Sequence, residues 1–372
     1  MPRIKGILVQ HTLACCLALL LGACASAPRN TPGDRLPGLG QRLLHDYMQP
    51  RTQALRQRTG QLQSALAEYC ARPSDGARRA AAEEQFGNVV AAWAQVEFLR
   101  FGPLVEQNRA DNFFFWPDPR GVVQRQMRSM LAGADASLLQ PDQLRQQSAA
   151  VQGIPALEYA LYADDAARVI AAGEAAGRYR CAFSSAVAEN LVRLATQIAA
   201  GWSSDAPLAV EFARPAARHA VYRSSGEVAT EALKAMSTAL HVARDQNLLP
   251  ALGEDAAASR GTLLPLHRSG LTTRYLAAGT QGLSQFHEAA RFGAALGEDK
   301  QWIDVGIRDE LRRAQEDFAQ LQVPATQALA DGSHRDLLVH AGLVLANARS
   351  MVDEYLAPAL DVNLGFNSLD GD

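Results

Sequence analysis

The sequence is poor in the features that mark several common protein classes. Aromatic residues make up only 6% of the 372 residues, and the formal net charge is only −3. Lysine and arginine are scattered and form no basic stripe, so the pattern excludes a nucleic-acid partner. Runs of β-branched residues are scarce, and no alternation of polar and apolar residues persists. The abundant alanine instead favours helix along nearly the whole chain, and the expected fold class is all-α.

The common signatures of hydrolytic enzymes are also missing. His287 and Glu288 are followed by Ala-Ala-Arg, so the sequence has no H-E-x-x-H zinc pair. It has no Gly-x-Ser-x-Gly turn and no exported free cysteine beside a histidine. We interpret His241, His267 and His287 as surface or capped histidines rather than ligands.

Two hydrophobic segments are assigned to packing. The C-terminal stretch DVNLGFNSLDGD lacks the spacing of a calcium loop, and we expect it to form a strap. The residues that would pack this strap onto the body are Leu364, Phe366 and Leu369. The aromatic cluster FFFWPD, residues 113–118, is expected to fill space between helices, with ligand stacking as the alternative.

Cysteine is rare, and three of the five cysteines lie near the N-terminus. Arg3 and Lys5 precede a mostly apolar run over residues 7–21, which ends in Leu-Gly-Ala-Cys24. This pattern resembles a bacterial lipobox, so we expect residues 1–23 to be a lipoprotein signal peptide and Cys24 to carry lipid. The alternative is an ordinary secretory signal with a chance cysteine.

The residue after Cys24 bears on which membrane the lipid-anchored protein would reach. Ala25 follows the cysteine where aspartate would stand in the bacterial signal for retention in the inner membrane. The resemblance to that sorting pattern implies a periplasmic protein anchored by lipid to the outer membrane. The apolar run is too short to be a good spanning helix of the mature protein.

Cys70 and Cys181 remain after the N-terminal cysteines are assigned. An even pair in an oxidising compartment is typical of a disulfide, and two separate buried thiols are the alternative. The bond would close a loop of about 110 residues and contribute about 4 kcal/mol in the chain-entropy account.

Pro- and Gly-rich residues near the N-terminus predict a flexible tether over 24–40. Beyond it the apolar spacing predicts a series of helices, one of which is capped by Ser74 or Asp75 and another by Asp118 with Pro119 in its first turn. The expected helices are 42–70, 75–101, 120–131, 142–163, 180–202, 226–246, 271–296, 301–322 and 333–356.

Two carboxylates lie on apolar helix faces. Glu97 shares a stripe with Val90 and Trp93, and Glu158 shares one with Ile154 and other apolar residues. An ionised acid in a core costs several kcal/mol unless it is paired, hydrogen-bonded, protonated or bound to metal. Each acid is therefore either a structural residue paired with arginine or part of a shared polar site with raised pKa values.

The position of Pro155 in its helix can be interpreted in two ways. If its helix begins near Gly153, the proline lies in the first turn and costs little. If the helix began earlier, the proline would leave the carbonyl of Val151 unpaired and kink the axis, which would create a site for a cation or a donor. The sequence leaves both readings open.

Four segments together resemble the imelysin-like family of bacterial cell-envelope proteins over nearly the whole mature chain. They are WAQVEFLRFGPL at 93–104, FFFWPDPRG at 113–121, AAVQGIPALEYALY at 149–162 and LGFNSLDGD at 364–372. The resemblance implies two packed helical bundles with long up-and-down helices, which we place at 41–205 and 206–372. Relatives in this family include an insulin-cleaving membrane protease and iron-regulated periplasmic lipoproteins.

The family's site lies near a Gly-x-His-x-x-Glu motif, which corresponds here to Gly153, Pro155 and Glu158. Proline occupies the histidine position, and this departure argues against peptidase activity and against metal binding through the motif. The other positions that resemble the family's site are Glu97, Trp116, Asp118, Arg120, Arg268 and Ser269.

The resemblance implies a non-catalytic envelope lipoprotein that binds iron, haem or a partner protein in iron acquisition. Glu158 and Glu97 are the expected metal ligands, since hard oxygen donors suit iron or calcium. The alternatives are a metallopeptidase of the imelysin type, with Glu158 as base or ligand, and a scaffold without a ligand.

Overall fold

The computed structural model describes residues 36–163 and 165–365. Within these ranges the chain is helical with short connections and contains no strand, as expected. None of the described helices is long and apolar enough to cross a membrane. The predicted signal peptide, Cys24, Phe366 and Leu369 lie outside the described residues.

The helices of the first half are α1 (Leu39–Arg42), α2 (Gln49–Ala71), α3 (Gly76–Ala94), α4 (Arg109–Phe113), α5 (Val122–Gly133), α6 (Pro141–Arg145), α7 (Ile154–Tyr162), α8 (Ala166–Ala172) and α9 (Ala175–Gly201). Those of the second half are α10 (Pro207–Ala213), α11 (Ser225–His241), α12 (Leu249–Leu252), α13 (Thr272–Ala290), α14 (Gln301–Gln320), α15 (Ala325–Ala328), α16 (Gly332–Ser350) and α17 (Ala357–Ala359). Three π-helical segments extend α2, α11 and α16: η2 (Leu43–Met48), η7 (Val242–Gln246) and η11 (Met351–Leu356).

The first bundle is built on α2, which packs against both α3 and α9. Leu55, Leu62, Leu66 and Tyr69 recur at helical spacing on α2, and all four side chains are buried. The side chain of Asp75 accepts hydrogen bonds from the first backbone N–H groups of α3, as its cap position predicts. The shorter α7 and α8 also pack against α9.

Cys70 at the end of α2 and Cys181 in α9 form the expected disulfide. Their Cα atoms are 5.6 Å apart, and 111 positions separate them in the sequence. The bond therefore fastens the two longest helices of the first bundle to each other.

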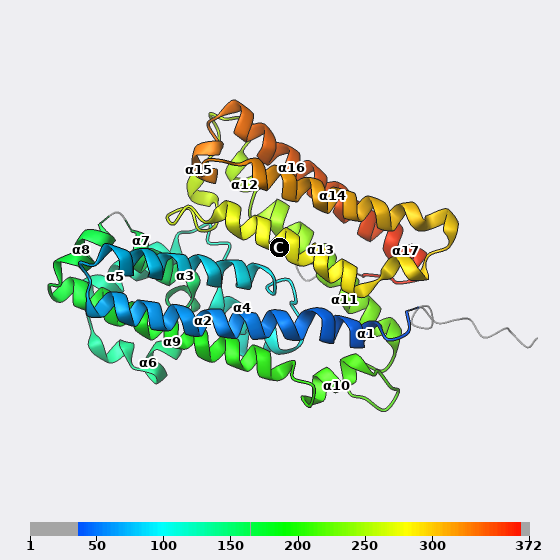
Figure 1. The fold of residues 1–372 in the computed structure, drawn as a ribbon, viewed down its shortest axis with the longest axis horizontal. Helices are drawn as coiled ribbons and strands as arrows, with labels where there is room; N and C mark the ends of the chain where they lie inside the picture. Colours follow the sequence, from blue (N-terminus) through cyan, green and yellow to red (C-terminus); the bar gives the residue numbers. More distant parts are fainter. Residues whose placement is uncertain (1–35, 164, 366–372) are drawn as a thin grey trace, which may run out of the picture.

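The second bundle consists of α11, α13, α14 and α16, in which α14 packs against both α13 and α16. Ser224 and Glu227 form a reciprocal capping box at the start of α11. Figure 1 shows α2, α3 and α9 in one layer and α13, α14 and α16 in the other. The predicted architecture of two packed bundles is therefore confirmed.

The two bundles share one hydrophobic core. The long α13 contacts α3 and η2 of the first bundle as well as α14 of the second. Phe286 on α13 packs edge-on against Tyr47 and Phe98 of the first bundle. Phe113 and Phe114 are also buried in this core, so the expected packing role of the aromatic cluster is confirmed for them.

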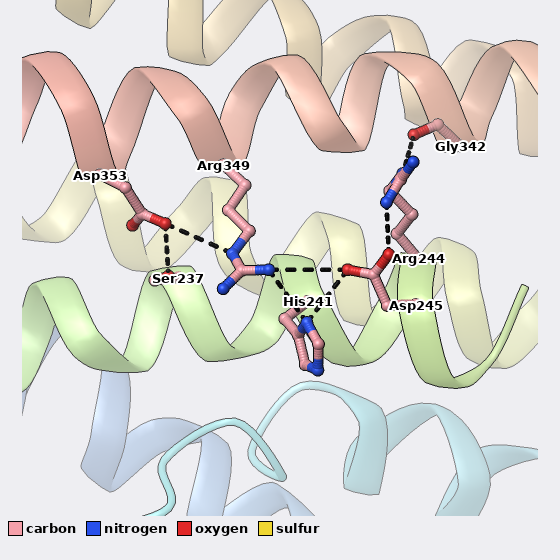
Figure 2. Close-up of polar contacts among 7 residues, drawn as sticks. All are labelled: Ser237, His241, Arg244, Asp245, Gly342, Arg349 and Asp353. Atoms are coloured by element: carbon pink, nitrogen blue, oxygen red, sulfur yellow. Dashed lines mark hydrogen bonds and ion pairs between the residues drawn. The ribbon is translucent and has the colours of Figure 1, made fainter. Parts of the chain in front are cut away.

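A chain of polar contacts joins α11 and η7 to α16 and η11 across the second bundle (Figure 2). Ser237 donates a hydrogen bond to Asp353, which also pairs with Arg349. The same guanidinium lies 3.0 Å from the His241 ring, which contacts Asp245. Three of these contacts involve Asp353 or Asp245, which lie in the π-helical segments, so the network fixes the register of α11 against α16 where the helical repeat changes.

Some predicted boundaries are wrong. The single helix expected over 142–163 is three separate pieces: α6, the short 3₁₀ turn η6 (Ala149–Val151) and α7. The helix expected to reach Phe101 ends at Ala94, and the one expected from Arg120 begins at Val122.

The predicted tether also overlaps the folded body. Leu36 and Leu39 are buried, and α1 begins at Leu39, so the last residues of the 24–40 segment belong to the first bundle. The segment before Leu36 lies outside the described residues.

Candidate functional site

Helix α7 begins at Ile154, so Pro155 lies in its first turn. Gly153 is the residue before the helix, and its extended backbone lets the Gly153 carbonyl accept the first helical hydrogen bond, from Leu157. The first of the two readings of Pro155 is therefore the correct one. The missing proline N–H costs nothing here, because first-turn N–H groups have no partner within a helix.

Gly153 is required by a close approach to α4. A Cβ atom at this position would lie 2.3 Å from the backbone oxygen of Phe113 and 2.7 Å from that of Asn112. The glycine thus lets α7 begin in contact with the backbone of the aromatic cluster. This contact positions Glu158, one turn further along α7.

Glu158 lies one turn into α7 and is only 3% exposed. Its Oε1 atom accepts two hydrogen bonds from Ser269, one from the backbone N–H at 2.9 Å and one from the hydroxyl at 2.8 Å. Burial raises the pKa of Glu158, while the Ser269 hydrogen bonds and the Arg268 charge oppose this rise. The carboxylate is thus held by a loop of the second bundle, 111 positions away in the sequence.

Glu158 lines a cavity of about 190 Å³ between the bundles. One wall consists of α7 and the segment from the aromatic cluster to α5, and the other is the loop before α13. The lining residues are Phe114, Trp116, Asp118, Pro119, Gly121, Val123, Gln124, Pro155, Glu158, Thr262, Leu263, Leu266, His267 and Arg268. The cavity therefore brings together Glu158, Trp116, Asp118 and Arg268 from the predicted site.

The expected companions of Glu158 differ in what they can offer a ligand. Both carboxylate oxygens of Asp118 accept backbone hydrogen bonds, from Val122 and Val123, the first residues of α5. The N-cap position itself is Gly121, so the predicted placement of Pro119 in the first turn of this helix is wrong. The buried Nε1 of Trp116 has no hydrogen-bond partner among the described residues. Arg120 is exposed and is not part of the cavity wall.

Arg268 supplies the positive charge of this cavity. Its guanidinium donates a hydrogen bond to Gln124 on α5 and lies over the ring of Tyr159, 5.1 Å from the ring centroid. These two contacts fix the charge next to Glu158 without using it in a direct ion pair.

His267 lines the same cavity. This role is not predicted from the sequence, which favours a surface or capped histidine at this position. Its Nδ1 lies 3.2 Å from the carbonyl oxygen of Leu264, and because a carbonyl only accepts, Nδ1 carries the proton. Burial lowers the pKa of His267, and the Arg268 charge lowers it further. The neutral ring thus leaves Nε2 as an acceptor, which is the usual arrangement of a metal-binding histidine.

Glu97 lies in a different cavity, of about 30 Å³, with Tyr275 and Asn247. The Tyr275 hydroxyl donates to Glu97 over 2.5 Å, and burial raises the pKa of Glu97 to about 7. Phe114, in the wall of the Glu158 cavity, stacks on Tyr275 at 5.4 Å. The predicted shared site of the two carboxylates is thus divided between two neighbouring cavities.

Sequence comparison identifies the family. The imelysin family profile, Peptidase_M75, matches residues 46–350. The chain belongs to the imelysin family. No curated protein matches the sequence.

Two crystal structures of bacterial proteins have the imelysin fold seen here. An imelysin-like protein from Psychrobacter arcticum 273-4 is 20% identical, with a TM-score of 0.72 over 90% of this chain and 98% of that chain. A protein of Parabacteroides distasonis ATCC 8503, described as an iron-regulated protein A precursor, is 13% identical. Its TM-score is 0.61, over 86% of this chain and 94% of that chain.

The chemistry of this imelysin cavity follows from its side chains. The cavity lining includes the carboxylate of Glu158 and the imidazole of His267, which are acceptors or metal-ligand groups, and the indole of Trp116, which is a donor. Pro155, at the histidine position of the motif, also lines the cavity, so His267 brings an imidazole into the cavity that the motif position no longer supplies. The sequence carried one signal for this role, since His267 directly precedes Arg268 and Ser269.

Proposed function

We propose that this protein is a non-catalytic imelysin of the bacterial cell envelope that binds iron in the Glu158 cavity. In this proposal lipid on Cys24 anchors it in the periplasm, at the outer membrane. The observation that carries the binding role is a buried carboxylate and a neutral imidazole in one cavity between the bundles.

The donor types support a transition metal such as iron over calcium or magnesium. Carboxylate and imidazole together suit iron, whereas calcium and magnesium prefer oxygen alone. The Nδ1–H of His267 is held by the Leu264 carbonyl, and Glu158 is held by Ser269, so both donors are oriented before any ligand binds.

The number of metal-ligating side chains and the volume of the cavity limit whether iron could bind as an ion or as haem. Across residues 36–163 and 165–365, no group of three or more His, Cys, Asp or Glu side chains is placed to hold a metal ion. Iron held by Glu158 and His267 would therefore keep water or other small ligands. A cavity of about 190 Å³ is small for haem, because drug-sized ligands occupy about 300–1,000 Å³.

One of the comparisons is relevant to the proposed role in iron physiology. One structural neighbour is described as an iron-regulated protein A precursor, although its 13% identity supports the fold and not the ligand. A role alongside a partner protein in iron acquisition is consistent with this neighbour. The corresponding test is the transcript level under iron starvation, which we expect to rise and which would stay constant for a protein unrelated to iron.

Calorimetric titration with ferric nitrilotriacetate tests the binding role. We expect one site in the wild type and an affinity at least about tenfold lower for Glu158→Gln and for His267→Gln, since each removes a donor. Glu97→Gln is the matched control, because it neutralises a half-buried carboxylate in the other cavity and should keep the affinity. Absence of binding by the wild type, or equal affinity of Glu158→Gln, would contradict the proposal.

A further inference from the structure

Two aromatic side chains contact each other on the surface of the second bundle. Trp302 in the first turn of α14 is 51% exposed, and Tyr355 of η11 is 46% exposed. Their rings meet edge to face, with centroids 5.2 Å apart. Val305, one turn further along α14, is 47% exposed and extends the apolar surface. We refer to Trp302, Val305 and Tyr355 as the aromatic end.

The aromatic end lies at the end of the molecule where the chain enters the fold. Arg42 of α1 donates a hydrogen bond to the carbonyl of Ala290, the last residue of α13. Gln301, next to Trp302, donates to the carbonyl of Gly293, a few residues after α13. Figure 1 agrees, since α1, the end of α13, the start of α14 and α17 all lie at the right-hand end of the long axis.

This placement limits the distance between the aromatic end and the predicted lipid. Leu36, the first described residue, is buried and follows Cys24 by 12 positions. Even fully extended, that length of chain spans only about 40 Å. A lipid on Cys24 therefore keeps this end of the body close to the membrane surface.

We propose that the aromatic end rests on the lipid surface, with the rings of Trp302 and Tyr355 in the headgroup region. Trp and Tyr prefer this region because each has an apolar ring and one polar group. The inference rests on the lipid anchor of the proposed function but not on its iron ligand. The anchor also makes a weak contact sufficient, because it turns membrane binding into an intramolecular step.

The surrounding charges indicate which force holds the contact. Exposed Lys300 precedes α14 and exposed Arg308 lies about two turns into it, while exposed Glu298, Asp299 and Glu354 carry the opposite charge, so the surface has no single sign. The contact should therefore form on zwitterionic as well as anionic lipid and persist in high salt, unlike a basic patch.

Fluorescence quenching by lipids brominated in their acyl chains tests the inference. The probe is residues 24–372, which contain every described residue and, with Cys70 and Cys181 bonded, only one free thiol. Coupling Cys24 to a maleimide lipid in phosphatidylcholine or phosphatidylglycerol vesicles supplies the anchor chemically. Failure of natural lipidation therefore cannot affect the outcome, and mass spectrometry of the envelope protein tests that step separately.

We expect brominated lipid to reduce the emission of Trp302 by about twofold or more and to shift it to shorter wavelength, in both lipids and in high salt. The signal is specific, because Trp93 and Trp202 are fully buried and the indole nitrogen of Trp116 is buried too. Trp302→Phe should remove the quenched component.

Two further variants separate lipid contact from simple proximity. Val305→Asp combined with Tyr355→Ser keeps Trp302 and should abolish the quenching, whereas Leu343→Ser should keep it. Leu343 is 57% exposed on α16 and is not part of the aromatic end, so its replacement by serine makes an apolar position polar on another surface. Unquenched Trp302 in the anchored wild type, or equal quenching in the double variant, would overturn the inference.

Discussion

Ser269 supplies the two hydrogen bonds that hold the buried Glu158 carboxylate. Its backbone N–H and its hydroxyl both donate to one carboxylate oxygen, and both oppose the rise in pKa that burial causes. Ser269 and Glu158 belong to different bundles, so these two hydrogen bonds also join the two bundles.

Ser269→Ala should raise the pKa of Glu158 further and lower the free energy of unfolding by about 1–2 kcal/mol, because one hydrogen bond to a buried carboxylate is lost. Urea denaturation measures this loss. Ser64→Ala is the control, since the Ser64 hydroxyl only bonds to Gly60 on the exposed side of α2, and its effect should stay within about 0.5 kcal/mol. Equal losses in the two variants would contradict this role of Ser269.

Glu97 gives the molecule a distinctive pH dependence. Its pKa is raised to about 7 mainly by burial, so the folded protein keeps a proton that the unfolded chain loses near pH 4.3. The contribution of Glu97 to the free energy of unfolding should therefore fall as pH rises from about 4.5 to about 7 and then level off. Glu97→Gln should flatten this part of the profile in denaturant titrations at several pH values; an unchanged slope would contradict the assignment.

At the scale of helices, α7 depends on the glycine that precedes it. Gly153→Ala would place a Cβ atom against the backbone of α4, and we expect a loss of about 1–3 kcal/mol from the forced backbone shift. Gly60→Ala on α2 has open space around the new methyl group and should instead stabilise the protein by about 0.5–1 kcal/mol. Thermal unfolding distinguishes the two, and a neutral Gly153→Ala would show that α7 can move away from α4.

The sequence predicts some of these helices well and others poorly. The stripe of Leu55, Leu62 and Leu66 predicts α2 because that helix has one buried and one exposed face over its whole length. Helix α7 is buried on nearly all sides from Ile154 to Ala160, so its periodicity does not separate it from the turns before it. That is why a single helix over 142–163 was expected.

The candidate site was predictable only where the signal is local. An acid on an apolar face predicted the burial of Glu158, and the motif resemblance pointed to Arg268 and Ser269. The role of His267 depends on how the loop before α13 folds against α7, which no spacing in the sequence encodes. The division of Glu97 and Glu158 between two cavities likewise depends on where the Phe114 and Tyr275 rings stack.

For the whole molecule, the Cys70–Cys181 disulfide joins α2 to α9 across most of the first half of the chain. Replacing both cysteines by serine should lower the free energy of unfolding by about 2–5 kcal/mol, because the unfolded chain gains freedom. Denaturant titration measures this effect. The wild type treated with reductant should lose stability to a similar extent, and unchanged stability in both would contradict a structural role for the bond.

The central claim is that iron binds between the bundles at Glu158 and His267. The most direct test is anomalous X-ray scattering at the iron absorption edge from crystals grown with ferric iron. We predict one strong anomalous peak within bonding distance of the Glu158 carboxylate and the His267 Nε2 atom, which is absent from Glu158→Gln crystals. A wild-type cavity without an anomalous peak, or a peak elsewhere on the molecule alone, would contradict the account.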